Sequence, residues 1–269
     1  TLASRFSDVA NVFDYGAKGD GTTDDRTAIQ AAINSGRGHV IIPAGYDFII
    51  SDAVELPSNF TLEINGDLLL APNSPDDRTM IRNSDRVNYQ NNIHVIGTGR
   101  VLGNKANQQS GVLIRHTCID FLKVIGCTIS VAEVGSNKWD NLYPDSPASG
   151  ISGCLQINDC RYCKVSGVLL YEWEHEGIAI DPLGGDCYGI VVENCICEGS
   201  GAESYSGIQM GGIGGTSYNN IISSCIVRNC GASGIGLDSR YSVVTGCTVW
   251  RNGYAHGINL GHSNAVADY

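Results

Sequence analysis

The chain has 269 residues, and 17 Lys and Arg stand against 28 Asp and Glu, which gives a formal net charge of −11. This charge disfavours a sequence-independent nucleic-acid binder, which needs a basic surface. The sequence contains no run of 18 apolar residues, so it predicts no membrane-spanning helix. A hydrophobic content of 42% is enough for a folded core, and 34 Gly indicate many turns between short elements.

The N-terminal region predicts a strand, a Gly-rich turn, a helix and a second strand over residues 11–50. Thr22 with Asp25 resembles a capping box at the start of the helix, and Gly36 fits its C-cap. The helix has one apolar face, made by Ala28, Ile29, Ala32 and Ile33. Such an element would cover the open first rung of a stacked fold.

The rest of the chain contains internal repeats. Five short apolar segments align, and their fourth positions are 41, 27, 30 and 22 residues apart at Cys127, Val168, Cys195, Cys225 and Cys247. A second motif recurs at 177–181, 207–211, 234–238 and 257–261, and 154–158 fits one repeat earlier. A period of this length with β-branched residues and no helical stripes predicts a parallel β-solenoid.

In this solenoid, residues 51–269 form the rungs. Two columns of apolar side chains are expected to stack inside it, made by Ile178, Ile208, Ile235 and Ile258 and by Ile180, Met210, Leu237 and Leu260. The last rung motif, 257–261, is followed only by a short segment that ends at Ala267–Tyr269 and resembles no cap. We therefore expect that further rungs or a trimerisation part could follow residue 269.

The 11 cysteines favour a ladder of buried free thiols. Cys127, Cys195, Cys225 and Cys247 would point inward as small apolar residues, and disulfides between some of them are the alternative. Cys160 and Cys163 form a lone Cys-x-x-Cys, which is too little for a metal site. Reduced thiols indicate folding in a host cytoplasm.

The stretch from Asn11 to Gly45 resembles the N-terminal cap of the pectate-lyase-like superfamily, a group of right-handed parallel β-helices. The superfamily includes phage tailspikes, pectate lyases, polygalacturonases and mannuronan C-5 epimerases. Residues 1–10 resemble the lead-in that precedes this cap in phage tail proteins. The resemblance implies an all-β, right-handed parallel β-helix with a short N-terminal capping α-helix.

Two outward columns are candidates for chemistry. One reads Asn158, Asp181, Gly211, Asp238 and Gly261, and its neighbour contains Gln209, a candidate for substrate binding. Asp181 and Asp238 would lie two rungs apart, roughly 10 Å, which suits an inverting glycosidase better than a retaining one. The alternative is that these carboxylates cap turns or pair with Arg240, itself a candidate substrate contact.

Two further segments supply candidates. In Glu172–Glu176, crowding would raise the pKa of Glu174 or Glu176 and suit a general acid, and Trp173 would stack on a sugar; a solvated acidic loop is the alternative. The long insertion 133–150 offers aromatic rings and polar groups for sugars, or else a packing or trimer contact. Its candidate residues are Lys138, Trp139, Asp140 and Tyr143.

The subfamily motifs match only in part. The epimerase motif Tyr-Gly-Phe-Asp-Pro-His corresponds to Ile178–Leu183, where Asp181 and Pro182 agree but the Tyr and His are replaced. The polygalacturonase motifs are not found in order. A calcium-dependent lyase would use Asp181, Asp238 and Arg240, but the few basic residues nearby favour hydrolysis.

We therefore expect a phage tailspike-type depolymerase that binds and hydrolyses a bacterial surface polysaccharide. It would be a homotrimer on the virion tail beside other tail proteins, without cofactor or metal. The alternatives are a lyase (with Ca²⁺) or C-5 epimerase, extracellular if bacterial, and a non-catalytic glycan-binding or structural tail protein.

Overall fold

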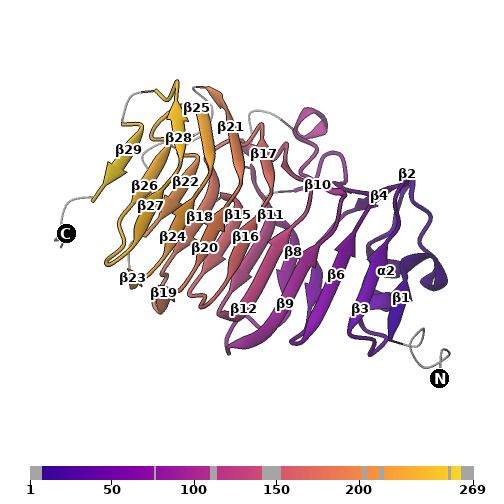
Figure 1. Cartoon of the computed structure of the whole chain (residues 1–269). Coiled ribbons are helices and arrows are strands. Elements are labelled where there is room, and N and C mark those ends of the chain that lie inside the picture. The colour runs from indigo at the N-terminus through magenta and orange to yellow at the C-terminus, as the bar shows by residue number, and fades with distance from the viewer. Residues whose placement is uncertain are drawn as a thin grey trace.

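The chain winds into a parallel β-helix in which each full turn adds one strand to each of three sheets, here A, B and C (Figure 1). The computed structural model describes residues 8–75, 77–109, 114–140, 153–201, 205–211, 215–253 and 256–261. The fold predicted from the repeats is confirmed.

The three sheets are formed by strands that follow one another in the order A, B, C. Sheet A contains β1 (Val9–Asn11), β3 (His39–Ile42), β6 (Phe60–Ile64), β9 (Gln90–Ile96), β12 (Val124–Ser130), β16 (Lys164–Ser166), β20 (Val191–Glu193), β24 (Ile221–Ser223) and β27 (Val243–Thr245). Sheet B contains β2 (Asp20–Asp24), β4 (Asp47–Ile50), β7 (Asp67–Leu70), β10 (Arg100–Leu102), β13 (Glu133–Gly135), β17 (Leu169–Tyr171), β21 (Ile196–Gly201), β25 (Ile226–Cys230) and β28 (Thr248–Trp250).

Sheet C is the one that carries most of the candidate residues. It contains β5 (Val54–Leu56), β8 (Arg78–Asn83), β11 (Ile114–Leu122), β15 (Gly153–Asn158), β18 (Glu176–Asp181), β22 (Ile208–Met210), β26 (Ile235–Leu237) and β29 (Ile258–Leu260), with β14 (Trp139–Asp140) antiparallel to β11. A separate pair, β19 (Asp186–Tyr188) and β23 (Thr216–Tyr218), lies at the corner between sheets C and A.

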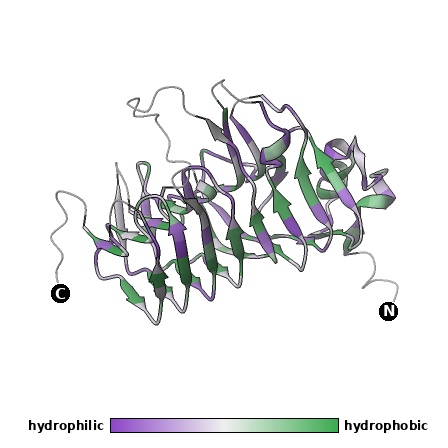
Figure 2. Cartoon of the chain, turned by 90° about the horizontal axis from the view of Figure 1, so that it is seen from above, coloured by the Kyte–Doolittle hydropathy of each residue, from purple (hydrophilic) through white to green (hydrophobic). Residues whose placement is uncertain are grey.

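The core is a set of apolar columns that run along the solenoid. In sheet A, Val165, Val192 and Ile222 occupy matching positions in successive strands and are fully buried. In sheet C, Ile178, Ile208 and Ile235 do the same. Figure 2 shows hydrophobic residues recurring on successive strands. Because inter-rung hydrogen bonds fix the register, each rung presents its apolar residues to the same interior.

The last described rung departs from the expected interior. Ile258 and Leu260 continue the columns of Ile235 and Leu237 in register, yet they are 42% and 53% exposed. No described rung lies on the far side of β29, so nothing in that part of the structure covers them.

The N-terminal helix forms, but it starts later than predicted. α2 spans Arg26–Ile33, and Thr22 belongs to β2. The Asp25 carboxylate makes no cap; it accepts hydrogen bonds from the backbone N–H of Lys18 and Gly19 instead. The described part of the chain also contains the 3-10 helices η1 (Val12–Tyr15) and η2 (Lys105–Asn107). Ile29, Ala32 and Ile33 are buried in the core cluster at the first rungs.

Two corners of the solenoid share one local pattern, which explains an error in the predicted alignment. At the A–B corner, left-handed residues such as Asn194 (φ 54°) and Ser224 (φ 52°) precede an inward Cys. At the C–A corner, Gly126 (φ 74°) likewise precedes Cys127. The register joins Thr128 to Lys164, so Cys127 lies beside Cys163 and not beside Val168 as predicted.

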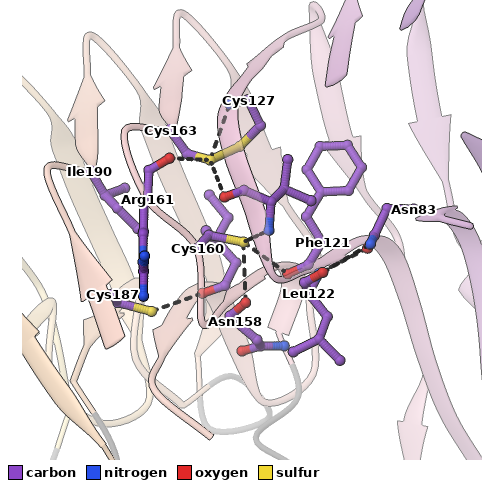
Figure 3. The surroundings of a disulfide bond; sticks show 12 residues. Asn83, Phe121, Leu122, Cys127, Asn158, Cys160, Arg161, Cys163, Cys187 and Ile190 are labelled. Carbon is purple, nitrogen blue, oxygen red and sulfur yellow. Dashed lines mark hydrogen bonds between the residues drawn. A yellow bond between two sulfur atoms is a disulfide. The ribbon is translucent and has the colours of Figure 1, made fainter. Parts of the chain in front are cut away.

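Cys127 and Cys163 form a disulfide between neighbouring rungs, with their Cα atoms 4.4 Å apart (Figure 3). The prediction that Cys127 is a free thiol is therefore wrong. The other nine cysteines are free, and eight of them are buried. Thiols of Cys195 and Cys225 donate to the carbonyl two residues earlier in the chain. Burial raises the pKa of Cys230 to about 12, which makes its thiol unreactive.

No helix among the described residues is long and apolar enough to cross a membrane.

The disulfide predicts the thiol count of the denatured protein. Of 11 cysteines, nine should react with a thiol reagent in denaturant without reductant, and all 11 after reduction. The double change Cys127→Ser and Cys163→Ser should lower the free energy of unfolding by about 2–4 kcal/mol, because the cross-link no longer constrains the unfolded chain. Eleven reactive thiols before reduction would contradict the bond.

Candidate functional site

The strands of sheet C bend near their starts, and this bend sets which side chains face outward. Cys118 and Ile119 are consecutive and both fully buried in the core, as are Cys154 and Leu155. In β18 the bend falls between Gly177 and Ile178, where a Cβ on Gly177 would meet the Trp173 ring at 3.2 Å. Gly177 and Ile178 therefore both face the core, and Glu176, the residue before this pair, faces outward.

The outward face of β18 therefore presents Glu176, Ala179 and Asp181. In register, Glu176 lies beside Gly153, and Asp181 lies beside Asn158. The chain continues this column through Gly211 to Asp238, because Gly211 N donates to the Ile180 carbonyl and Asp238 N to the Met210 carbonyl. The predicted two-rung separation of Asp181 and Asp238 is thus present.

Burial divides these carboxylates, which were expected to lie together on an open face. Asp181 has no exposed surface and Glu176 is 6% exposed, whereas Asp238 is half-buried. Both oxygens of Asp181 and Oε2 of Glu176 have no hydrogen-bond partner among the described residues. A buried carboxylate without partners strongly favours its protonated form.

The two buried acids influence one another. Burial raises the pKa of Asp181 well above its usual range. Burial first, and then the negative charge of Asp181, raise the pKa of Glu176 in the same direction. Asn158 lies beside Asp181 in the preceding rung, and its Oδ1 is also buried and accepts no hydrogen bond from the described residues. A protonated Asp181 would have a proton to offer at neutral pH.

A polar network that the sequence did not reveal extends from Asn158. Its Nδ2 donates to Oδ1 of Asp120 and to Oε1 of Gln156, at 3.3 Å each. Asp120 is paired with Arg86 at 2.5 Å, and Gln156 contacts Thr117. Only the register of β11 and β15 places these residues together, so no local motif could have identified them.

An open pocket lies over the outward face of β22 and β26, next to the buried acids. It is a cavity of about 150 Å³. Its polar lining consists of Tyr205, Ser206, Gln209, Ser233, Asp238 and Asn259. Two residues predicted from the sequence, Gln209 and Asp238, therefore meet here. Hydroxyl, amide and carboxylate groups around a small cavity are suited to hydrogen bonds with sugar hydroxyls.

Glu174 lies outside this site. Its Oε1 forms ion pairs with Lys105 at 2.9 Å and with Lys138 at 3.3 Å, and Glu174 is 6% exposed. Glu174 is thus held by two lysines away from the pocket lining, and its role as a general acid stays a prediction. Lys138, predicted to bind substrate, is occupied by the same ion pair.

The other residues predicted to bind substrate do not lie together at the pocket. Trp173 is fully buried, so it offers no face to a sugar. Arg240 is exposed at the C–A corner, bridged to Tyr218, and forms no ion pair with Asp181 or Asp238 among the described residues. The backbone of Trp139 and Asp140 pairs with Arg115 and Ile114. Tyr143 lies outside the described residues.

The comparisons with known proteins agree with the fold. A family model described as "Rhamnogalacturonase A/epimerase, pectate lyase-like" matches residues 9–259. The chain belongs to this family. The match covers nearly every rung described above, including every residue of the polar pocket lining.

Solved structures of the same fold come from several functional classes. A Geobacillus virus E2 protein, ORF18, is similar with a TM-score of 0.73 and 16% identity over 97% of this chain and 52% of that protein. PfbA, a surface adhesin of Streptococcus pneumoniae, has a TM-score of 0.64 and 18% identity over 89% and 62%. An exopolygalacturonase from Thermotoga maritima has a TM-score of 0.58 and 13% identity over 94% and 75%.

These identities establish the fold alone. The chain spans about half the length of the viral protein and less than two thirds of the adhesin. Curated relatives match over 70 residues or fewer, a tenth or less of their own length.

The buried acids predict how stability depends on pH. In the unfolded chain, Asp181 and Glu176 lose their protons near their ordinary pKa values of 3.8 and 4.5, whereas the folded protein holds both protons to higher pH. The folded state therefore binds more protons above about pH 4, and stability falls as pH rises from there. Asp181→Asn and Glu176→Gln should each raise the melting temperature at pH 8 and flatten this fall.

The control is Asp14→Asn, which changes an exposed carboxylate in the N-terminal region. It should leave the pH profile of the melting temperature unchanged. A melting temperature at pH 8 that drops in both buried variants would mean that these carboxylates are ionised and favourably bound in the folded protein.

Proposed function

We propose that the chain is the polysaccharide-acting β-helix of a phage tail protein and that it hydrolyses a bacterial surface polysaccharide. The observation that carries the proposal is the outward column of sheet C, where the buried, proton-holding Asp181 is followed two rungs later by the accessible Asp238. Membership of a family of rhamnogalacturonase and epimerase type supports a polysaccharide as the substrate.

The proposed reaction assigns one carboxyl group to each proton transfer. Asp238 would take a proton from a water molecule in the pocket, and the water oxygen would attack the anomeric carbon. Protonated Asp181 would give its proton to the glycosidic oxygen, whose bond to that carbon breaks. A separation of roughly 10 Å leaves room for the water, as in inverting enzymes. This route needs no cofactor.

Gly211 allows the two carboxyl groups to share one surface. It lies between them in the column with φ of 99°, and a Cβ there would come within 1.9 Å of the Asp238 carbonyl oxygen, so only glycine lets the Asp238 backbone approach this closely. Gln209 and Asn259 would hold sugar hydroxyls at the pocket. Because Asp181 has no exposed surface, hydrolysis requires that residues above it move aside when the polysaccharide binds.

A second candidate is a non-catalytic glycan-binding protein. The same burial of Asp181 favours it, since Asp238 is the one carboxylate among the described residues that line the pocket, and a lone carboxylate can bind without cleaving. The similarity of fold to a surface adhesin is compatible with this candidate. The proposed hydrolase would be located on the virion tail as a homotrimer. Light scattering tests the homotrimeric state.

Cleavage of a panel of capsular and O-antigen polysaccharides separates these functions. Hydrolysis should yield new reducing ends without ultraviolet absorbance, and EDTA should not change the rate. Absorbing products, or activity that needs Ca²⁺, would mean a lyase and contradict the proposed route. Binding without cleavage would favour the second candidate.

On a cleaved polysaccharide, Asp238→Asn should lower the rate by about 10²–10⁴-fold, because water loses its general base. Glu193→Gln is the matched control, since it changes an outward carboxylate of sheet A that is paired with Lys164. It should leave the rate within about twofold of the parent. An unchanged rate in Asp238→Asn would place the chemistry elsewhere.

A further inference from the structure

The strands β19 and β23 lie at the corner between sheets C and A (Figure 1). This corner carries a ladder of arginine and tyrosine side chains. Arg161 is bridged to Tyr188, Tyr188 pairs with Tyr218, and Tyr218 is bridged to Arg240. The Tyr188 and Tyr218 rings stack with centroids 5.0 Å apart. The Arg161 guanidinium lies over the rings of Tyr89 and Tyr188, at 4.5 Å and 5.2 Å. The corner is therefore held by one row of stacked groups.

The next residue in each rung occupies a left-handed backbone position. In most rungs this residue is small or amide-bearing, as Gly and Asn tolerate that conformation. These residues are Asn59, Asn92, Gly126, Gly189 and Asn219. Tyr162 (φ 55°) and Tyr241 (φ 51°) are the exceptions. A bulky residue rarely adopts this conformation, so both tyrosines are present against a backbone preference.

Both of these tyrosines present their rings to solvent. Tyr162 is 62% exposed and Tyr241 is 69% exposed. Such residues do not contribute much to the core, so burial of apolar surface gives no reason for an aromatic ring at either position.

The Tyr162 ring is fixed before any ligand arrives. It lies over Gly189, where a Cβ would come within 2.7 Å of its Cδ1 atom. Its edge meets the Tyr188 ring, with centroids 5.1 Å apart. A hydrogen bond between the Tyr162 and Tyr188 side chains raises the pKa of Tyr162. A ring held in this way loses little conformational entropy when a ligand stacks on it.

We propose that Tyr162 and Tyr241 are two stacking platforms of a glycan-binding surface outside the pocket, which holds the polysaccharide along the solenoid axis. The inference rests on the proposed function. The chain reaches this corner directly after Asn158, Asp181 and Asp238, so the surface borders the outward column. The platforms lie three rungs apart, roughly 14 Å, so an extended oligosaccharide reaches both and a disaccharide only one.

The test uses titration calorimetry with the full chain. An array of capsular and O-antigen oligosaccharides first identifies the one that binds most tightly, and its disaccharide is the short probe. Tyr162→Asn and Tyr241→Asn should each weaken binding of the long oligosaccharide by about three- to tenfold, and the double variant more. For the disaccharide, the double variant should weaken binding no more than the stronger single variant.

Asn is the residue that other rungs use at this position, so these variants should melt at or above the temperature of the parent. Gly189→Ala should weaken binding as Tyr162→Asn does, because its Cβ displaces the ring. Asn92→Gly changes the same turn position in an earlier rung and is the neutral control. Unchanged affinity in the double variant overturns the inference but leaves the proposed function in place. If the parent binds no glycan on the array, both are overturned.

Discussion

The structure depends on the hydrogen-bonded register between neighbouring rungs. Along sheets A, B and C, successive strands pair in parallel from one turn to the next, so a residue is stacked on its counterpart and not on its neighbours in sequence. The same register buries Ile178 on Ile208, joins Cys127 to Cys163 and aligns Asp181 with Asn158. Core, cross-link and candidate site are thus consequences of one constraint.

This constraint also explains the chemistry of the outward face. Where the outward face of sheet C is buried, at Asp181 and Glu176, polar side chains lie in a medium that disfavours their charge. Asp120 has Arg86 as a partner there, whereas Asp181 and Glu176 have no cation near them among the ion pairs of the described residues. Burial raises the pKa of all three acids, and only for Asp120 does a neighbouring cation, Arg86, partly offset that effect.

Much of the fold follows from the sequence, and less of the site does. The repeats predicted the strands and the column from Asp181 to Asp238, because period and alternation are local signals. They did not predict which of two similar corners contains Cys127, nor the bend that turns Glu176 outward. The burial of Trp173 and the two lysines on Glu174 arise from contacts between distant segments. Such contacts leave no pattern in a single sequence.

A crystal structure with a bound oligosaccharide tests the central claim most directly, that the outward face of sheet C binds the polysaccharide. The account predicts sugar density over β22 and β26, with hydroxyls bound to Asp238 and Gln209 and the glycan chain directed along the solenoid axis. Density confined to the outer face of sheet A or sheet B would contradict it.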